Sequence, residues 1–324
     1  MNSSLAALAN ILRASSGLSA KRDIALAAER LDVSGASSVP VGDDCAAIPD
    51  GDGYTLFAIE GFMNEFVAGD PWFAGWCGVM VNVSDVAAMG GRPVAVVDAI
   101  WASGEREADP VLAGLHAAAT AFGIPVVGGH TNLKTDRSQL SVAILGKAKR
   151  LLTSFDAKPG ERLIAAVDLR GRYREKFSNW EAATAAPPAR LRADYELLPA
   201  IAEAGLCRSA KDISQGGIVG TAAMLADCSG VGASIDIRAL PKPEDVSDER
   251  WLLTFPSFGF LLSVAPHNVD GVIGHFHRRG IAANDIGVIT ADRRVAITAG
   301  DASEVICDLS VTSLLGCAPK GVAA

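Results

Sequence analysis

The sequence is poor in several features that would mark a function by themselves. No apolar run reaches the roughly 20 residues that a membrane span needs, so a transmembrane protein is not expected. The segment from Met1 to Ala14 has no basic residue before its apolar part, which argues against a secretory signal. Lysine and arginine form no large cluster, and a net charge of −8 gives no support to a nucleic-acid surface. A soluble globular protein is therefore expected.

The six cysteines are scattered along the chain and form no motif. They include no C-x-x-C pair and no histidine at zinc spacing, so neither a disulfide framework nor a zinc site is expected. A reducing cytoplasm is accordingly the expected location. The role of Cys317, near the end of the sequence, stays open.

What the chain does have is enough apolar residues for a large core. It has 324 residues, of which 49% are hydrophobic, and a mean hydropathy of +0.26. This length favours about two domains. Strand and helix patterns alternate in two blocks that meet near residue 150, which predicts two α/β or α+β domains over residues 1–150 and 151–324.

The clearest elements have strict apolar periodicity or an obvious end signal. In the first block the pattern predicts strands at 55–59, 95–100 and 140–145 and a helix at 108–122 that Gly123 ends. In the second block it predicts strands at 163–167, 258–264 and 285–289 and helices at 190–204, 216–229 and 268–279. The five tryptophans are expected mainly in the core, with stacking on a flat substrate as the alternative.

The most informative stretch is 81–93, because it sets one carboxylate, Asp85, among small residues between two apolar runs. Such flanks predict a buried element, in which an acidic side chain needs a reason to be present. One reading is that Asp85 serves chemistry, and the other is that it caps a helix end. The stretch by itself leaves both open.

Three further turns between apolar runs also offer metal-type ligands. They are Gly42-Asp43-Asp44, Gly128-Gly129-His130-Thr131 and Lys211-Asp212-Ile213-Ser214. Mg²⁺ prefers oxygen ligands and typically uses one or two carboxylates together with substrate phosphates. Separate aspartates on these turns are therefore predicted to share the metal ions of a bound nucleotide.

These four motifs, in this order and spacing, resemble the aminoimidazole ribonucleotide synthetase (PurM-like) superfamily. The superfamily includes thiamine-monophosphate kinase, selenophosphate synthetase, the hydrogenase-maturation carbamoyl dehydratase and formylglycinamidine synthase. The resemblance covers nearly the whole chain. The segment 171–260 is most similar to a branch named only as synthetase-like or as related to methanogenesis marker proteins.

The resemblance implies an α/β plus α+β fold of two domains. The N-terminal domain, 1–150, would bind ATP and Mg²⁺ and join a second copy of the chain in a dimeric β-barrel, while 151–324 would form a C-terminal α+β sandwich. ATP would lie in the cleft between the two domains. The implied partners are a small-molecule acceptor and a second copy in a homodimer, with no nucleic acid and no membrane.

The resemblance also implies roles for individual residues. The implied metal ligands are Asp43, Asp44, Glu60, Asp85, His130 and Asp212. The implied nucleotide-binding residues are Gly42, Asp44, Asn82, Gly128, Gly129 and Thr131, and the implied catalytic residues are Asp43, Asp85, Asp212 and Lys211. Three positions depart from the superfamily pattern, because Glu60 and His130 stand where relatives carry aspartate and Gln215 replaces a further aspartate of the thiamine-phosphate kinases.

The acceptor side is less distinct in the sequence. Arg170, Arg172 and Arg174 alternate at the start of the second block, and Lys211 directly precedes Asp212. These cations could face an anionic acceptor or the phosphates of ATP. The alternative is a solvated basic loop or ion pairs with neighbouring acidic residues.

The predicted activity is ATP- and Mg²⁺-dependent phosphoryl transfer to a small molecule, similar to that of thiamine-monophosphate kinase but with an unknown acceptor. A ligase-like or dehydrating enzyme that activates an amide or carbamoyl oxygen is one alternative. A nucleotide-binding subunit without catalysis is the other, and the departures at Glu60, His130 and Gln215 favour it.

Overall fold

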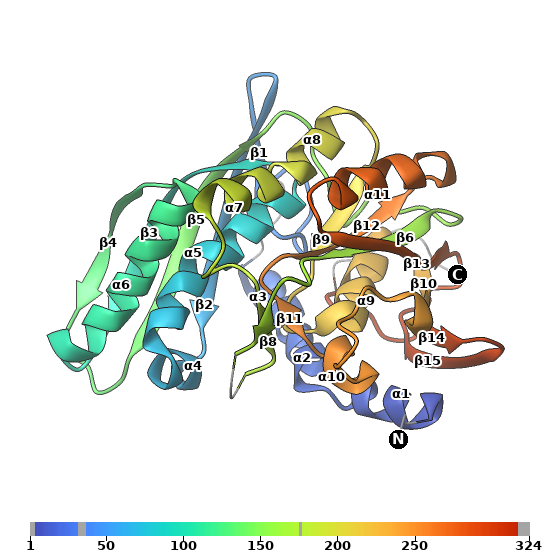
Figure 1. Cartoon of the computed structure of the whole chain (residues 1–324), viewed down its shortest axis with the longest axis horizontal. Coiled ribbons are helices and arrows are strands. Elements are labelled where there is room, and N and C mark those ends of the chain that lie inside the picture. The colour runs from blue at the N-terminus through green and yellow to red at the C-terminus, as the bar shows by residue number, and fades with distance from the viewer. Residues whose placement is uncertain (1–3, 32–36, 175–176, 317–324) are drawn as a thin grey trace. The chain divides into compact units, whose positions relative to one another are not determined.

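The computed structural model describes residues 4–31, 37–174 and 177–316, which divide into two compact units (Figure 1). The smaller unit comprises Asp44–Leu151 and Ala183–Ala200, and the larger unit comprises the rest. The domains predicted from the sequence, residues 1–150 and 151–324, stay a prediction. The first 43 residues belong to the larger unit, and Ala183–Ala200 belongs to the smaller one.

The smaller unit is built on a five-stranded sheet with strand order β1-β2-β5-β3-β4. All neighbouring strands are antiparallel except β3 and β4, which are parallel. The elements of this unit are β1 Ala46–Asp50, β2 Gly53–Phe62, α4 Asn64–Gly69, α5 Pro71–Ala88, β3 Arg92–Trp101, α6 Glu105–Phe122, β4 Val126–Asn132, β5 Gln139–Ala148 and α7 Pro188–Tyr195; α8, Leu197–Glu203, follows and ends in the larger unit.

Helix α5 is the central helix of the smaller unit. Asp70 caps its start by accepting a hydrogen bond from the Phe73 amide at 3.3 Å. Glycines then let α5 and α6 approach closely, since a Cβ atom at Gly75 would lie 1.9 Å from the Val111 carbonyl oxygen and one at Gly114 would lie 1.8 Å from that of Trp72. Larger residues at either position would push the two helices apart.

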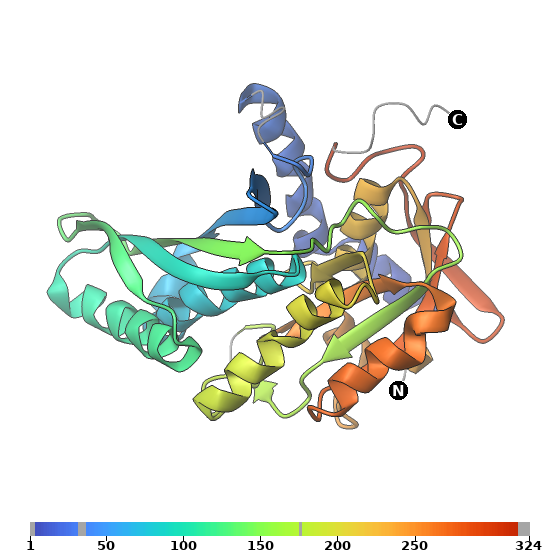
Figure 2. The same ribbon diagram turned by 90° about the horizontal axis from the view of Figure 1, so that it is seen from above.

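The two faces of this sheet differ. Helices α5 and α6 lie on one side of it (Figure 2), where Leu56, Val142 and Ile144 are fully buried. On the other face the alternating residues stay exposed within the unit, with Phe57 at 50% and Ile59 at 66%. The smaller unit therefore leaves one apolar face of its sheet uncovered by its own helices.

The larger unit is built on a seven-stranded mixed sheet with strand order β15-β14-β10-β13-β6-β12-β9, beside a small sheet of order β11-β8-β7. Its helices are α1 Leu5–Arg13, α2 Ser16–Ser19, η1 Ala20–Arg22, α3 Asp23–Leu31, α9 Gly217–Ser229, η2 Ile237–Ala239, α10 Asp248–Leu252, η3 Pro266–Asn268 and α11 Val269–His277. Its strands are β6 Arg162–Val167, β7 Arg172–Tyr173, β8 Asn179–Glu181, β9 Ser209–Asp212, β10 Gly232–Asp236, β11 Phe255–Pro256, β12 Gly259–Val264, β13 Ala282–Thr290, β14 Arg294–Ala299 and β15 Ala302–Asp308.

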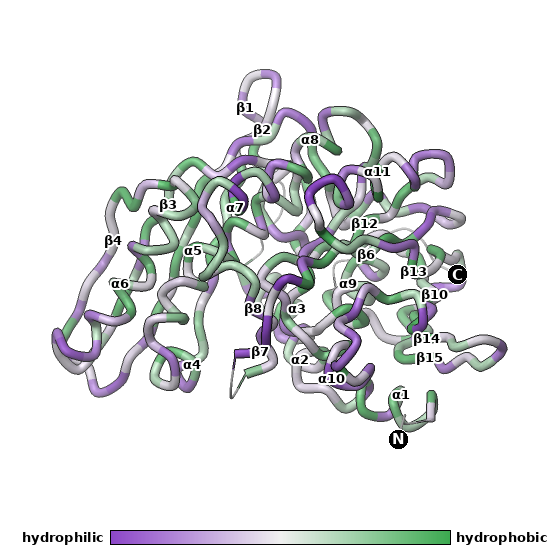
Figure 3. Tube along the Cα trace, in the orientation of Figure 1, coloured by the Kyte–Doolittle hydropathy of each residue, from purple (hydrophilic) through white to green (hydrophobic). Residues whose placement is uncertain are grey.

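The core of the larger unit lies on both faces of its seven-stranded sheet. Every residue of β9 and β12 is buried, and the hydrophobic colour of β6, β12 and α9 in Figure 3 marks the same region. Helices α1 and α9 pack on one face, and α11 packs on the other through Val272 and Phe276. Among the described residues, no helix is both long enough and apolar enough to cross a membrane.

The predicted elements are all present, with one difference. The predicted helix at 190–204 is two helices, α7 and α8, which meet at Glu196. Pro199 explains the break, because a continuous helix would press its ring against the carbonyl of Tyr195. As the third residue of a new helix, Pro199 needs no backbone N–H. The predicted end of the helix at Gly123 is confirmed by its left-handed φ of 72°.

Candidate functional site

Asp85 lies in the last turn of α5 and is 5% exposed. The helix dipole places partial negative charge at this end, so a carboxylate here is electrostatically unfavourable. An aspartate that caps a helix belongs at the opposite end. The capping interpretation of Asp85 is therefore wrong for this helix, and the buried carboxylate needs a positive partner or a metal ion.

Ser84, the neighbour of Asp85, connects α5 to Ala183–Ala200, the later stretch of the chain that belongs to the smaller unit. The Ser84 hydroxyl lies 3.2 Å from the Met80 carbonyl oxygen, to which it donates, and 3.0 Å from the Tyr195 hydroxyl. Tyr195 is buried and packs edge-on against Phe122 of α6. Its position beside Ser84 could not be read from the sequence, because the two residues are 111 positions apart.

Asp44 lies beside Asp85 within the smaller unit. One carboxylate oxygen of each lies within 4.8 Å of the other, and Asp44 is only partly buried. Two carboxylates at this separation repel each other unless a cation lies between them or one of them is protonated. This pair fits a hard divalent cation such as Mg²⁺, which prefers carboxylate oxygens.

Asp43, the adjacent residue, belongs to the larger unit and has a different environment. One of its oxygens accepts a hydrogen bond from the Ser154 amide at 2.9 Å, and the other accepts one from the Ser154 hydroxyl at 2.7 Å. Gly42, with a φ of 120°, turns the chain just before it. The structure thus gives Asp43 a bracing role in its loop, while its predicted metal role stays a prediction.

Lys211 and Asp212 end strand β9 of the larger unit, and each is 4% exposed. Strand β12 pairs with them along one side. The turn after Asp212 leads directly into α9, and Gly217 is required there because a Cβ atom would lie 2.0 Å from the Leu252 carbonyl oxygen. A buried carboxylate just before a helix N-terminus suits metal-bound phosphates.

Asn82, predicted to bind nucleotide, is fully buried between α5 and the sheet. Its amide nitrogen donates to the carbonyl oxygens of Gly78 at 2.8 Å and Val142 at 3.0 Å. Its side-chain oxygen has no hydrogen-bond partner among the described residues. Asn82 therefore fastens α5 to β5 and keeps one buried acceptor for a water or a ligand.

Glu60 and Asp98 share one row of the sheet, because Val142 of β5 stands directly opposite both of them. The row lies on the face that α5 covers. Two effects act on the pKa of Asp98. Burial, the larger effect, raises this pKa, and a hydrogen bond to its own backbone lowers it. Asp98 was missed in the sequence, although it is the one charge in the apolar strand 95–100.

The Gly128-Gly129-His130-Thr131 motif forms most of β4, an edge strand whose residues are all exposed within the described chain. His130 pairs with Ala99, and its ring centroid lies 5.9 Å from that of Trp101. A Cβ atom at Gly129 would lie 2.5 Å from a carboxylate oxygen of Asp98, so this glycine leaves room for that carboxylate.

The motif is thus separate from the Asp44–Asp85 pair in the geometry of the smaller unit. His130 shares its face of the sheet with Ala99, whereas α5 and Asp85 pack against the opposite face. Its predicted metal role, and the nucleotide-binding roles of Gly128, Gly129 and Thr131, stay predictions.

The three alternating arginines have different surroundings. Arg170 makes a two-pronged ion pair with the buried Asp168, at 2.7 and 3.1 Å, and donates to the Arg279 carbonyl oxygen. The ion-pair alternative therefore describes Arg170. Arg172 is exposed and Arg174 is partly buried. Cys317 lies outside the described residues.

Comparison with protein families gives two adjacent matches. The N-terminal domain of AIR synthase related proteins matches residues 42–148, and the C-terminal domain of the same proteins matches residues 169–300. The first match begins at Gly42, the start of the first motif, and the second includes Asp212.

Individual relatives agree with these matches. An uncharacterized protein of Synechocystis sp. is 45% identical over 93% of this chain and 94% of its own length. The phosphoribosylformylglycinamidine synthase subunit PurL of Methanosarcina acetivorans is 26% identical over 86% of this chain, which spans only 42% of that protein. The solved structure of AaThiL complexed with AMPPCP and TMP shares the fold, with a TM-score of 0.65, 22% identity, and coverage of 84% of this chain and 91% of that chain.

Proposed function

The chain belongs to the AIR synthase related family, a family of ATP-dependent enzymes, and from this premise we propose that it catalyses Mg²⁺-dependent phosphoryl transfer from ATP to a small molecule. The observation that carries the proposal is the buried Asp85 beside Asp44. Neither helix capping nor core packing accounts for that pair of carboxylates. ATP with Mg²⁺ accounts for both its charge and its burial.

Asp44 and Asp85 would hold Mg²⁺ through their carboxylate oxygens, and Asp212 of the larger unit is proposed to contribute a further oxygen. When bound, Mg²⁺ neutralises the charge that develops on the phosphates during transfer. Lys211 would orient a phosphate oxygen. Asn82 would hold α5, and with it Asp85, at a fixed height above the sheet through its bond to Val142.

The test is thermal unfolding with the ATP analogue AMPPCP. A ligand that binds only the folded state raises the melting temperature. We expect a rise with AMPPCP plus Mg²⁺, a smaller rise with AMPPCP alone, and loss of the Mg²⁺-dependent part in Asp85→Asn and in Asp212→Asn. Asp136→Asn is the matched control, because that side chain is 82% exposed. An unchanged Mg²⁺ effect in Asp85→Asn contradicts the proposal.

A second candidate is activation of an amide or carbamoyl oxygen by ATP, followed by loss of phosphate. The similarity to PurL over 86% of this chain favours it, since that relative is a synthase. Product analysis separates the two reactions. ADP with a phosphorylated acceptor supports phosphoryl transfer, whereas ADP with free phosphate and a dehydrated or ligated product supports the second candidate.

We also propose that the enzyme is a homodimer in which the uncovered face of the five-stranded sheet meets the same face of a second copy. Exposed apolar side chains on neighbouring strands support this, namely Phe57, Ile59, Val97 and Leu145. Contiguous apolar patches of this kind mark interaction sites. Sedimentation should give a dimer for the wild type and a monomer for Ile59→Asp, whereas the rim variant Asp52→Asn should stay dimeric. A monomeric wild type contradicts the dimer.

A further inference from the structure

A buried serine outside the predicted motifs holds the turn Gly42-Asp43-Asp44. Ser154 lies in the connection between β5 and β6, within the larger unit, and is 0% exposed. Its amide and its hydroxyl donate to the two carboxylate oxygens of Asp43, at 2.9 and 2.7 Å. Two hydrogen bonds from one residue to one charged group fix the orientation of that group. Asp43 is therefore held by a partner 111 positions away in the chain.

Ser154 is itself held in place by further hydrogen bonds. Its carbonyl oxygen accepts one from the Ser229 hydroxyl at 2.7 Å, and this hydroxyl in turn accepts one from the Ala157 amide at 3.0 Å. The amide of the adjacent Thr153 donates to the Arg208 carbonyl oxygen at 2.9 Å, just before β9. Because these bonds attach the connection to α9 and β9, Ser154 meets Asp43 as a fixed support.

The C-terminal end of α9 also holds the residue before Asp43. The Cys228 thiol lies 3.6 Å from the Gly42 carbonyl oxygen, to which it donates. Gly42 has a φ of 120°, a backbone conformation that favours glycine. Cys228 and Ser229 are the last two residues of α9, and the same helix begins directly after the Asp212 turn. Helix α9 therefore borders two of the predicted metal-binding segments.

We propose that Ser154 is a positioning residue for Mg²⁺ binding, because by fixing Asp43 it fixes the backbone from which Asp44 presents its carboxylate. One peptide bond joins the two aspartates, which holds their Cα atoms about 3.8 Å apart. A ligand whose backbone is fixed in advance loses less conformational freedom when the ion binds, and the partners that orient ligands raise metal affinity. Asp43 then acts through Asp44 and not as a metal ligand. This inference rests on the proposed Mg²⁺ role of Asp44.

The experiment is thermal unfolding of the full chain at saturating AMPPCP while Mg²⁺ is titrated. The measured quantity is the Mg²⁺ concentration that gives half of the Mg²⁺-dependent rise in melting temperature. Ser154→Ala removes the hydroxyl bond to Asp43, so it should raise this concentration by about three- to tenfold. The rise with AMPPCP alone should not change. A residue that served only stability would lower the melting temperature without ligand and leave the Mg²⁺ concentration as it is.

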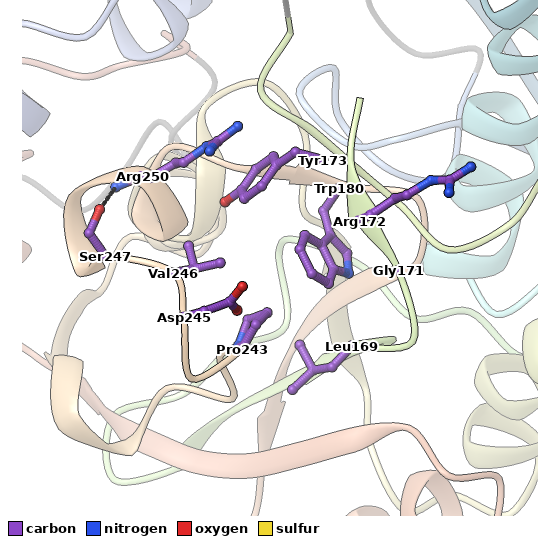
Figure 4. A pocket seen from close by; sticks show the side chains of 10 residues that line it. All are labelled: Leu169, Gly171, Arg172, Tyr173, Trp180, Pro243, Asp245, Val246, Ser247 and Arg250. Atoms are coloured by element: carbon purple, nitrogen blue, oxygen red, sulfur yellow. Dashed lines mark hydrogen bonds between the residues drawn. The ribbon is translucent and has the colours of Figure 1, made fainter. Parts of the chain in front are cut away.

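Two serines supply matched controls. Ser263 is 2% exposed, and its hydroxyl donates to the Glu161 carboxylate at 2.5 Å, so Ser263→Ala breaks the same kind of bond at similar burial. Figure 4 shows the second, Ser247, whose hydroxyl accepts from the Arg250 amide at 3.3 Å. It lines a pocket of about 590 Å³, to which Trp180 also belongs but neither Asp43 nor Ser154 does. Both alanine variants should keep the wild-type Mg²⁺ concentration.

Two further variants test the connection between Ser154 and Asp43. Ser229→Ala, at a partly buried residue, removes only the support of the Ser154 carbonyl and should raise the Mg²⁺ concentration by about twofold. Asp43→Ala should raise it at least as much as Ser154→Ala does. Adding Ser154→Ala to Asp43→Ala should raise it no further, because the pair is already broken.

Two results overturn the proposal while leaving the proposed function intact. One is a wild-type Mg²⁺ effect that neither Ser154→Ala nor Ser229→Ala shifts. The other is a double variant in which the effects of Asp43→Ala and Ser154→Ala multiply, as they would if Asp43 bound the metal independently of Ser154. A wild type without any Mg²⁺ effect contradicts the proposed function, and this inference with it.

Discussion

The two large sheets of this protein differ in how completely their own units cover them. In the larger unit β12 and the edge strand β9 are buried along their whole length, with helices on both faces of the sheet. In the smaller unit, β4 is exposed at every residue, and β2 alternates from Leu56 onward between buried or partly buried and exposed positions. The first pattern is typical of a finished core, and the second is typical of a surface that meets something else.

Because of this difference, the two sheets restrict the residue types of their strands in different ways. Buried strands of the larger unit accept almost only apolar residues, so the charged pair Lys211–Asp212 at the end of β9 stands out there. In the smaller unit α5 covers one face of the sheet. Asp85 is a buried carboxylate in the last turn of this helix. Both exceptions fall within the predicted motifs.

The largest expected effect concerns stability. Leu261→Ala, in the covered sheet, should lower the free energy of unfolding by about 2–5 kcal/mol, because it leaves a cavity in the core. Ile59→Ala, on the uncovered face, should change it by less than about 0.5 kcal/mol in a monomeric sample. Urea unfolding at low protein concentration measures both. Equal losses would mean that the face of Ile59 is already covered within one chain.

The next effect concerns the covered face of the smaller sheet. Asn82→Ala should cost about 1–3 kcal/mol, because the buried carbonyl of Val142 loses its bond from the asparagine side chain. Asn10→Ala, which breaks a bond to Arg13 at the surface, is the matched control and should cost much less. Thermal unfolding compares the two. A loss no larger than that of the control would show that Asn82 does not fasten α5 to the sheet.

A smaller effect on stability is expected from a change in Ala183–Ala200, the later stretch of the chain that belongs to the smaller unit. Tyr195→Phe keeps the packing on Phe122 and removes the hydrogen bond to Ser84, so it should cost about 0.5–1.5 kcal/mol. Tyr54→Phe is a comparable change on strand β2 outside this contact. If Tyr195→Phe cost no more than Tyr54→Phe, the contact between the Tyr195 and Ser84 hydroxyls would contribute no stability.

The smallest effect is a pH dependence from Asp98. Burial raises its pKa, so the folded state holds this proton to higher pH than the unfolded state does. The contribution of Asp98 to the free energy of unfolding is therefore fully present at acid pH. It is lost as the pH rises from about 3.8, the ordinary pKa, through the raised pKa of the folded state. Asp98→Asn should be more favourable relative to the wild type at pH 7 than at pH 3.5, in thermal unfolding at both values. The reverse order would contradict the burial of this carboxylate.

Sequence patterns were sufficient for most of the fold, because helices such as 108–122 and strands such as 163–167 carry their own periodicity and end signals. They also identified Asp85 as anomalous, since a lone charge in an apolar segment is visible locally. Pro199 was visible as well, and reading it would have placed the break between α7 and α8 correctly.

Contacts between distant parts of the chain could not be predicted in this way. The position of Tyr195 beside Ser84, the bracing of Asp43 by Ser154, and the sheet row shared by Glu60 and Asp98 depend on register and on tertiary packing. The sequence records the residues of such contacts but not their partners. For the same reason it placed Trp180 in the core without revealing that its ring also forms the wall of a pocket.

The most direct test of the central claim is a crystal structure of the chain with AMPPCP and Mg²⁺. We predict an Asp85 carboxylate oxygen about 2.1 Å from a Mg²⁺ ion that also contacts the phosphates, with Asp44 or Asp212 as a further ligand. A nucleotide with its Mg²⁺ bound away from Asp85 would contradict the claim.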